Sequence, residues 1–411
     1  MPKTAEISET PGQRFGSAYG MGALAAVSAM HFINDLHPTM LPTFLPEMVS
    51  RLGLTLAEAG FLSTLFGVFN LVVQPFAGHF ADRLNRPSLA LLAPFLTATG
   101  ACLLPVAPSF RVALLFVSVM GFGTASFHPQ GHGLAGLFGG NKNLGLSLAI
   151  FAAAGNLGAA LSPLYGIFLL GALGPSRMPF AILFVLVVAL VARRAVPSGY
   201  VDKGRTESAS ASAHKGETTS GRFFRVFMIC LPITLIALIR DTTSQGIRVF
   251  LPLLVTGRGG GIELGGAVLF AFTLAGSFST LVGGRMADIF GKRRVILIMM
   301  ILAPIFLFPA VKLSGMFSVV LFVLGGACIA STAPVTIAMA QEFVPESRST
   351  ASSLVMGVPW GLANIMASPI GKLGDIIGLE TALSFVALSP LLVAASMAVG
   401  AVFKRARRPE K

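Results

Sequence analysis

Long apolar stretches recur along the whole chain and show no regular polar stripe. A helix needs about 20 mostly apolar residues to cross the hydrocarbon core of a bilayer, whereas a helix on a water-soluble core keeps one polar face. The pattern therefore predicts an all-α membrane protein. We expect twelve transmembrane helices, at residues 20–49, 55–80, 87–107, 110–138, 143–171, 177–197, 223–256, 264–286, 293–312, 315–342, 349–377 and 379–403.

The same pattern repeats at a fixed offset of 206 residues. Residues 44–46 (FLP) return as residues 250–252, and Asp35 returns as Asp241. Further pairs at this offset are 78–83 with 284–289, Ser147 with Ser353, Gly155 with Gly361, and Ser162 with Ser368. Because six is an even number, each half begins and ends on one side of the membrane, so the two six-helix repeats are parallel.

The repeat divides the chain into five predicted segments. They are an N-terminal tail (1–19), a first six-helix bundle (20–197), a linker (198–222), a second six-helix bundle (223–403) and a basic tail (404–411). The linker is rich in Ser, Thr, Ala, Lys and Glu and has no apolar period, which is typical of a flexible connection.

The charges are few and unevenly placed. Hydrophobic residues make up 54% of the 411 residues and charged residues only 11%, with a net charge of +13. Of the 30 Lys and Arg residues, 22 fall on the side of the termini and linker and six on the other side. The positive-inside rule therefore predicts a multi-pass protein of the bacterial inner membrane with both termini in the cytoplasm. The basicity is explained by topology, and we expect no nucleic-acid partner.

Other kinds of site find little support in the sequence. Cys102, Cys230 and Cys328 all fall inside predicted spans and resemble small apolar residues. No metal-ligand spacing, nucleophile motif or nucleotide-binding domain is present. We therefore predict no enzyme activity, no cofactor and no metal, and an energy source that is an ion or substrate gradient.

Two loop sequences resemble a family signature. Residues 78–86 (GHFADRLNR) and 284–294 (GRMADIFGKRR) are similar to the loop between helices two and three of major facilitator superfamily transporters. Glycine permits close helix approach, and an aspartate can cap a neighbouring helix. The resemblance implies a gating or conformational role for Gly78, Asp82, Arg83, Gly284, Asp288 and Arg293.

A narrower resemblance is confined mainly to the first half. Residues 31–35 (HFIND), 74–75 (QP), 123–129 (GTASFHP) and 147–158 (SLAIFAAAGNLG) are similar to the fosmidomycin-resistance family. That family implies drug efflux, with phosphonate-type and other toxic compounds exported in exchange for protons. The chain departs from the family at residues 130–133 (QGHG), where an acid followed by basic residues is usual.

Ionisable residues deep in a membrane span are costly, about 2.5–3.5 kcal/mol each, so each is a candidate for function. They are His31, Asp35 and His37 in the first helix, His128 and His132 in the fourth, and Arg240, Asp241 and Arg248 in the seventh. In the superfamily that the chain resembles, helices one, four, seven and ten line the central cavity.

Proton coupling is predicted at Asp35, with His128 and Asp241 as further candidates. Asp35 follows His31 by four residues, on the same helix face, and no Arg or Lys adjoins it. Asp241 adjoins Arg240 and should remain ionised. Two alternatives stay open: the acids form structural ion pairs, or His128 bonds the backbone carbonyl that Pro129 frees.

Substrate binding is predicted mainly on the seventh helix. A guanidinium forks onto carboxylate or phosphonate, so Arg240 and Arg248 suggest an anionic cargo. The alternative is that Asp241 and Glu342 neutralise both arginines. The remaining candidates for substrate contact are His31, Asn34, Gln245 and Trp360.

These observations favour a secondary active transporter. The leading hypothesis is a proton-coupled exporter of small toxic or anionic organic compounds that works by alternating access, as a monomer in the lipid bilayer. The alternative is an importer of an organic acid by proton symport. A non-transporting membrane receptor or a lipid-modifying enzyme is a third hypothesis, and the duplicated halves argue against it.

Overall fold

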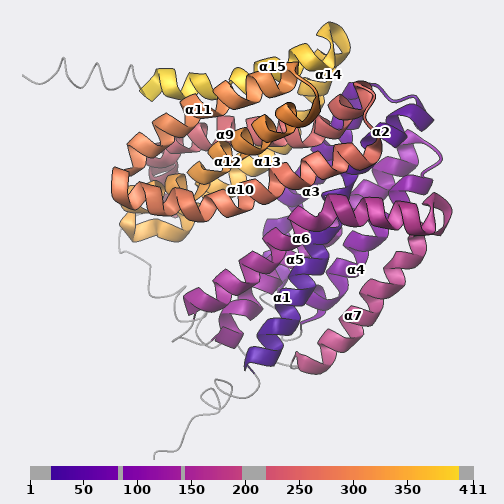
Figure 1. Ribbon diagram of the computed structural model, residues 1–411. Coiled ribbons are helices and arrows are strands. Elements are labelled where there is room, and N and C mark those ends of the chain that lie inside the picture. The colour runs from indigo at the N-terminus through magenta and orange to yellow at the C-terminus, as the bar shows by residue number, and fades with distance from the viewer. Residues whose placement is uncertain (1–19, 82–86, 140–143, 197–218, 398–411) are drawn as a thin grey trace, which may run out of the picture.

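The computed structural model describes residues 20–81, 87–139, 144–196 and 219–397, and every regular element in these ranges is a helix (Figure 1). The predicted gating residues Asp82 and Arg83 lie outside the described residues, as do both predicted tails and most of the linker. Within these ranges, eleven helices are long and apolar enough to cross a membrane. The predicted all-α membrane fold is confirmed.

The helices of the two halves follow the predicted spans closely. The first half consists of α1 (Gly20–Leu36), α2 (Met40–Leu52), α3 (Leu56–Ala81), α4 (Ser88–Leu103), α5 (Phe110–Gly139), α6 (Leu144–Leu173) and α7 (Ala181–Ala195). The second consists of α9 (Thr219–Gly257), α10 (Ile262–Phe290), α11 (Lys292–Lys312), α12 (Gly315–Phe343), α13 (Arg348–Ile365), α14 (Ala367–Ile377) and α15 (Leu379–Leu388). Short 3₁₀ turns follow α4 (Leu104–Val106), precede α7 (Pro175–Phe180) and precede α13 (Pro345–Ser347).

The first predicted span is a broken helix, which explains eleven spans where twelve were expected. α1 and α2, of 17 and 13 residues, are separated by a turn over residues 37–39. Pro38 lies in this turn, and proline cannot donate a backbone hydrogen bond and clashes with the preceding turn of a helix. The His37 ring donates from Nδ1 to the Ile33 carbonyl at 2.7 Å, which satisfies a backbone group at the break.

The span predicted at residues 349–377 is also divided. α13 ends at Ile365 and α14 begins at Ala367, with Met366 between them. Backbone bonds from Met366 to Leu362 and from Ile370 to Met366 carry the helical course across this point. The last predicted span begins with α15 and continues as helix to residue 397 after a turn at Ser389.

The offset of 206 residues is visible in the helix bounds. α3 begins at Leu56 and α10 at Ile262, a difference of 206, and α5 and α12 begin at Phe110 and Gly315, a difference of 205. α9, the counterpart of α1, is unbroken through residues 243–245, which correspond to the turn at residues 37–39. Proline is absent there, since the counterpart of Pro38 is Ser244. The backbone plan is duplicated, and Pro38 accounts for the break between α1 and α2 that α9 lacks.

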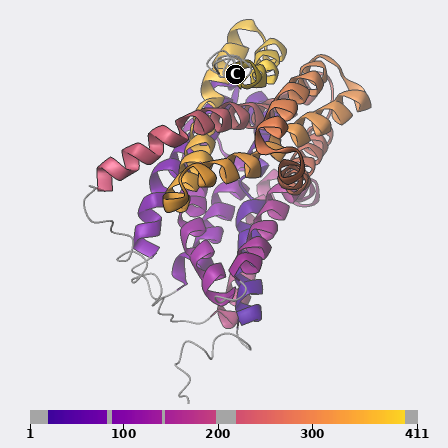
Figure 2. The ribbon, with the colours of Figure 1, turned by 90° about the vertical axis from the view of Figure 1, so that its left-hand side faces the viewer.

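The two halves pack side by side along a limited set of helices. In Figure 1 the indigo-to-magenta helices α1–α7 lie beside the orange-to-yellow helices α10–α15, and Figure 2 shows the same division from the side. Contacts between the halves are made chiefly by α3 with α13 and α14, by α6 with α10, and by α2 with α9. We call the side where α7 ends and α9 begins the linker side, and the opposite side, where α3 begins, the far side.

The interface of α3 with α13 and α14 is built on close backbone approach. A Cβ atom on Gly60 would lie 2.3 Å from the Ala367 carbonyl oxygen, and one on Gly371 would lie 2.1 Å from the Leu56 carbonyl oxygen. Thr64 Oγ1 lies within 3.1 Å of the Asn364 carbonyl. Lipid gives helices no hydrophobic drive to associate, so small residues and interhelical hydrogen bonds of this kind hold membrane bundles together.

The far-side end of this interface carries a charged cap. Asp375, near the end of α14, accepts backbone N–H bonds from Leu56 at 2.8 Å and from Ala57 at 3.0 Å. These are the first amides of α3, which belongs to the other half. An anion at a helix N-terminus is favoured by the free N–H groups and by the helix dipole.

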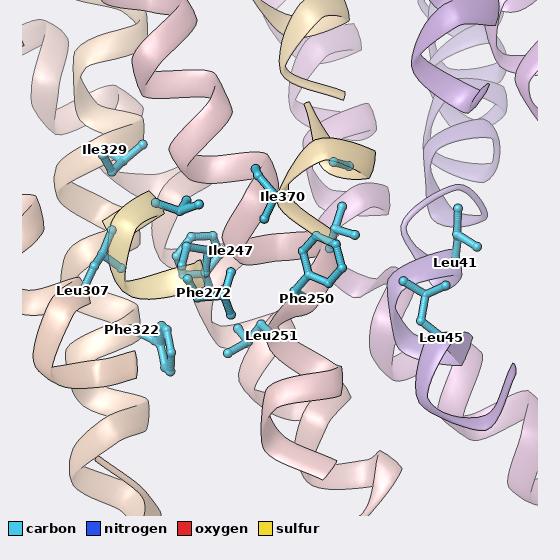
Figure 3. Close-up of a cluster of buried hydrophobic side chains, with 14 of the residues drawn as sticks. Leu41, Leu45, Ile247, Phe250, Leu251, Phe272, Leu307, Phe322, Ile329 and Ile370 are labelled. Atoms are coloured by element: carbon cyan, nitrogen blue, oxygen red, sulfur yellow. The ribbon is translucent and has the colours of Figure 1, made fainter. Parts of the chain in front are cut away.

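The largest buried apolar cluster joins the two halves. Figure 3 shows Leu41 and Leu45 of α2 and Phe250 of α9 in one cluster with side chains of α10, α11, α12 and α14. Leu45 and Phe250 are fully buried. Because this cluster reaches across the boundary, the contact between halves in this conformation is a packed core on the far side.

Candidate functional site

The deep ionisable residues of α1 lie together on one helix face, as their spacing predicts. His31 Nε2 lies 3.2 Å from Asp35 Oδ2. His31 is almost fully buried, whereas 21% of the Asp35 side chain is exposed. Among the described residues no lysine or arginine lies within ion-pair distance of Asp35. The titratable partners of the carboxylate among the described residues are therefore imidazoles.

α5 brings a second histidine to the same carboxylate. His128 Nε2 lies 3.8 Å from Asp35 Oδ1, and the His128 and His31 rings meet edge to face at 5.3 Å. His128 Nδ1 is buried and has no hydrogen-bond partner among the described atoms. The histidine therefore does not bond the carbonyl that Pro129 frees, and it faces Asp35. His132, one turn on, donates from Nδ1 to the His128 carbonyl at 2.9 Å.

α6 supplies the wall behind His31. The Phe151 ring stacks on the His31 ring with 4.0 Å between centroids, and the Phe151 carbonyl lies 2.7 Å from His31 Nδ1. Gly155 leaves room for the imidazole, since a Cβ there would lie 2.4 Å from His31 Nε2. The close approach of α6 to α1 thus fixes the histidine ring.

A polar chain connects this site to α4. Asn34 donates from Nδ2 to Asp35 Oδ1 at 2.9 Å. The side-chain oxygen Oδ1 of Asn34 accepts a hydrogen bond from Thr97 Oγ1 at 2.9 Å. Thr97 is also 3.4 Å from Thr124 Oγ1 of α5. Asn34 and the two threonines are buried. Asn34 is therefore engaged in orienting Asp35.

The corresponding acid of the second half has a different environment. Arg240 donates from Nε and Nη2 to the two oxygens of Asp241, at 2.8 and 2.9 Å. Its Nη1 donates to Thr336 Oγ1 of α12 at 2.8 Å. This geometry agrees with the alternative in which Asp241 neutralises Arg240, and the guanidinium makes three hydrogen bonds.

Further along α9, Gln245 and Arg248 differ in their partners. Gln245 donates to Asn364 Oδ1 of α13 at 2.8 Å, and Asn364 in turn donates to the Trp360 carbonyl. Arg248 makes no hydrogen bond or ion pair with the residues that the structure describes. Glu342, the second proposed neutraliser, binds Lys292 at 2.7 Å instead. That part of the neutralisation hypothesis is wrong.

Comparison with known proteins identifies the family. The sequence profile of the Major Facilitator Superfamily matches residues 27–259 and 233–411. The chain belongs to the major facilitator superfamily. Its predicted all-α, two-repeat major facilitator fold is confirmed, and the chain is a membrane transporter and not an enzyme.

Two relatives extend over most of this major facilitator chain. It is 25% identical over 379 residues to the fosmidomycin resistance protein of Escherichia coli (strain K12), covering 90% of this chain and 91% of that protein. It is 28% identical over 378 residues to the uncharacterized MFS-type transporter YfnC of Bacillus subtilis (strain 168), covering 90% of each. The resemblance to the fosmidomycin-resistance family is thereby supported.

Solved structures show the same fold. A bacterial homologue of the human lysosomal transporter Spinster, in an inward-facing and occupied conformation, superposes with a TM-score of 0.80 at 16% identity, over 94% of this chain and 98% of that one. The nucleoside transporter NupG superposes with a TM-score of 0.70 at 13% identity, over 93% and 98%.

The second copy of the major facilitator loop differs in part from expectation. Gly284 has open space where a Cβ would lie, so it is not a close-approach glycine. Gly283 has that role, because a Cβ there would lie 1.9 Å from the Ser331 carbonyl oxygen of α12. Asp288 and Arg293 are exposed, and among the described residues Asp288 makes no hydrogen bond or ion pair. Of the first copy, Gly78 lies within α3.

The structure brings the first-half candidates His31, Asn34 and His128 together around Asp35. The second-half candidates Arg240 and Gln245 on α9 have partners within their own half. Sequence reasoning missed Phe151, Thr97 and Thr336, which hold His31, Asn34 and Arg240 in place. Threonine within an apolar helix was the available signal for two of them, whereas a backbone carbonyl such as that of Phe151 has no signal in the sequence. Trp360 lies between the halves, where its ring meets Phe66 of α3 edge to face at 6.2 Å.

The arrangement around Asp35 is suited to binding a small cation. His31, Asp35 and His128 each present one lone-pair atom, and the three atoms lie within 4.8 Å of one another. A proton satisfies such a set through hydrogen bonds between imidazole and carboxylate. The Asp35 side chain is 21% exposed, so the protein does not enclose it completely.

Proposed function

We propose that this transporter is a proton-coupled exporter of small toxic or anionic organic compounds that works by alternating access. The observation that carries the proposal is the environment of Asp35, which has two imidazole neighbours, no lysine or arginine partner among the described residues and a side chain that is 21% exposed. A carboxylate in this setting can gain and lose a proton during the cycle. Asp241, by contrast, accepts two charge-assisted hydrogen bonds from Arg240.

The cargo proposal draws on the relatives. A fosmidomycin resistance protein is similar over 90% of this chain, so fosmidomycin is the natural first probe. Arg248, with no bonded partner among the described residues, is the cation best placed to meet a phosphonate or carboxylate group. We further propose that the protein works as a monomer in the bacterial inner membrane, with both termini in the cytoplasm, as the distribution of Lys and Arg favours.

The test uses everted membrane vesicles that hold an acid interior and a pH-sensitive dye. Addition of fosmidomycin should release protons from vesicles that contain the wild-type protein. Asp35→Asn should abolish this release, because an amide cannot carry the proton, while the amount of protein in the membrane stays the same. Glu58→Gln, at a partly exposed acid near the start of α3, is the matched control and should behave as wild type. Unchanged proton release with Asp35→Asn refutes the assignment, and loss with Asp241→Asn alone transfers it to the second half.

A second candidate function is import of an organic acid by proton symport. The guanidinium of Arg248 favours it, because it has no bonded partner among the described residues and could meet a carboxylate. The two functions differ in the direction of anion movement relative to the proton. Export predicts that expressing cells resist fosmidomycin, whereas import predicts growth on, or sensitivity to, an organic acid. Uptake of a labelled acid that an inward proton gradient accelerates would establish the second function in place of the first.

A further inference from the structure

His31 makes two contacts that a neutral imidazole beside an ionised carboxylate cannot satisfy. The Phe151 carbonyl can only accept a hydrogen bond, so the proton between them at 2.7 Å belongs to His31 Nδ1. In a neutral ring the other nitrogen, Nε2, then carries a lone pair. That lone pair would face the Asp35 oxygen at 3.2 Å. Two lone pairs repel each other at this distance, so a proton must lie between them.

The ring cannot escape this arrangement by turning over. Phe151 stacks flat on it at 4.0 Å, and Gly155 is in contact with its edge. The His31 side chain is only 7% exposed. A ring turned over by 180° would occupy the same plane but would lose the hydrogen bond from Nδ1 to the Phe151 carbonyl. α6 therefore fixes the order of the two nitrogens and keeps Nε2 within ion-pair distance of the acid.

The other polar neighbours of Asp35 contact its Oδ1 atom, so among the described residues Oδ2 faces His31. Oδ1 accepts from Asn34 at 2.9 Å and faces His128 Nε2 at 3.8 Å. The only other titratable group packed here among the described residues is His132 of α5, whose ring lies 6.0 Å from that of His31. α4 contributes Thr97 through Asn34, and α6 contributes Phe151 and Gly155.

We infer that His31 and Asp35 hold the coupling proton jointly, between Nε2 and Oδ2, with His31 as the residue that positions it. This inference rests on the proposed proton coupling and names its second participant. The proton is lost from the pair as a whole, since removing it leaves the two facing lone pairs. His31 was expected to bind substrate, and here both of its ring nitrogens serve Phe151 and Asp35.

The first test is spectroscopic and requires no cargo. The full chain, labelled with ¹⁵N-histidine and ¹³C-aspartate, is purified in detergent and its NMR shifts are followed with pH. His31→Gln and Asp35→Asn assign the two signals by their disappearance. We expect the His31 and Asp35 signals to follow the same macroscopic transitions, because strongly interacting groups titrate as a pair. We expect Asp35→Asn to convert His31 to a neutral ring with the proton on Nδ1.

His37→Gln is the matched control. His37 is a buried histidine of the same helix region, with Nδ1 bound to the Ile33 carbonyl and Nε2 without a partner among the described atoms. The His37→Gln variant should leave the Asp35 NMR signal unchanged. A neutral His31 beside an ionised Asp35 at neutral pH, or an Asp35 signal that is the same in wild type and His31→Gln, overturns the inference.

The second test separates this inference from the proposed function. In the vesicle assay, His31→Gln should move the pH at which fosmidomycin-driven proton release is half-maximal, and His37→Gln should not. If the NMR titration shows the shared proton but fosmidomycin releases no protons from wild-type vesicles, the cargo or the coupling is wrong and the shared proton stands. If wild-type vesicles release protons and the pH profile of His31→Gln matches wild type, His31 does not position the coupling proton.

Discussion

Asp375 is the residue through which the α3–α14 interface can be tested as a gate on the far side. Its carboxylate accepts the backbone N–H groups of Leu56 and Ala57 across the boundary between halves. In alternating access this interface must separate when the cavity opens to the far side. We predict that Asp375→Asn weakens the closed state, because the neutral amide loses the attraction between a carboxylate and the α3 N-terminus.

The size of the effect follows from the exposure of Asp375. A charge near an exposed helix N-terminus contributes about 0.3–1 kcal/mol, and a tenfold change in an equilibrium constant corresponds to about 1.4 kcal/mol. The far-side-open population should therefore rise about two- to fivefold. Because the carboxylate is exposed, the difference between variant and wild type should shrink as salt concentration rises.

The assay measures how often the interface opens. Thr64 is buried at the interface, against the Asn364 carbonyl, so Thr64→Cys should react with a membrane-impermeant maleimide only when the halves separate. The three native cysteines are first replaced by alanine. In this background Asp375→Asn should raise the labelling rate about two- to fivefold, since the rate follows the open population.

Glu58→Gln provides the control for a general effect on α3. The Glu58 carboxylate accepts from Thr55 N and Thr55 Oγ1 within the same half, so it caps the same helix without touching the other half. Its removal should leave the labelling rate unchanged. The reasoning is refuted if the two variants raise the rate equally, or if Asp375→Asn leaves it at the wild-type value.

Three further predictions concern the interior. Gly155→Ala places a Cβ 2.4 Å from the His31 ring. This variant should lower the free energy of unfolding by about 1–3 kcal/mol, which would be measured as a lower melting temperature. It should also show the same altered pH profile of proton release as His31→Gln. Arg240→Gln leaves the acid Asp241 without its cation and should cost about 3 kcal/mol of stability, much of which the double variant with Asp241→Asn should restore. Arg248→Gln should raise the half-saturating fosmidomycin concentration about tenfold, the equivalent of about 1.4 kcal/mol. The melting temperature should not change. If the saturation curves of the variant and the wild type are equal, Arg248 is not part of the binding site.

Several features of the site could be read from local sequence, because they depend on helical spacing. The i, i+4 relation of His31 and Asp35 places them on one face of any helix, and they are in contact at 3.2 Å. Arg240 and Asp241 could be paired as neighbours. Pro38 was a signal for the break between α1 and α2. The long apolar run over residues 20–49 nevertheless led to the prediction of a single span.

Contacts between helices far apart in the sequence could not be predicted in this way. Nothing near His128 indicates that it faces Asp35, 93 positions earlier, instead of the carbonyl freed by Pro129. Asp375 resembles an ordinary exposed acid at a helix end, and only the packing of α14 on α3 places it on the Leu56 amide. Gly283 and Gly284 are adjacent and alike in sequence, and the approach of α12 decides which of them must be glycine.

The sequence by itself determined the membrane location, the helix plan and the duplication, because each follows from the cost of placing polar backbone and charge in lipid and from a fixed chemical period along the chain. The tertiary structure alone decided the partners of the buried charges. Asp35 lies among imidazoles, and its repeat counterpart Asp241 is held by a guanidinium. Partners are set by which helices pack together and at what rotation, and that depends on side-chain fit over the whole bundle.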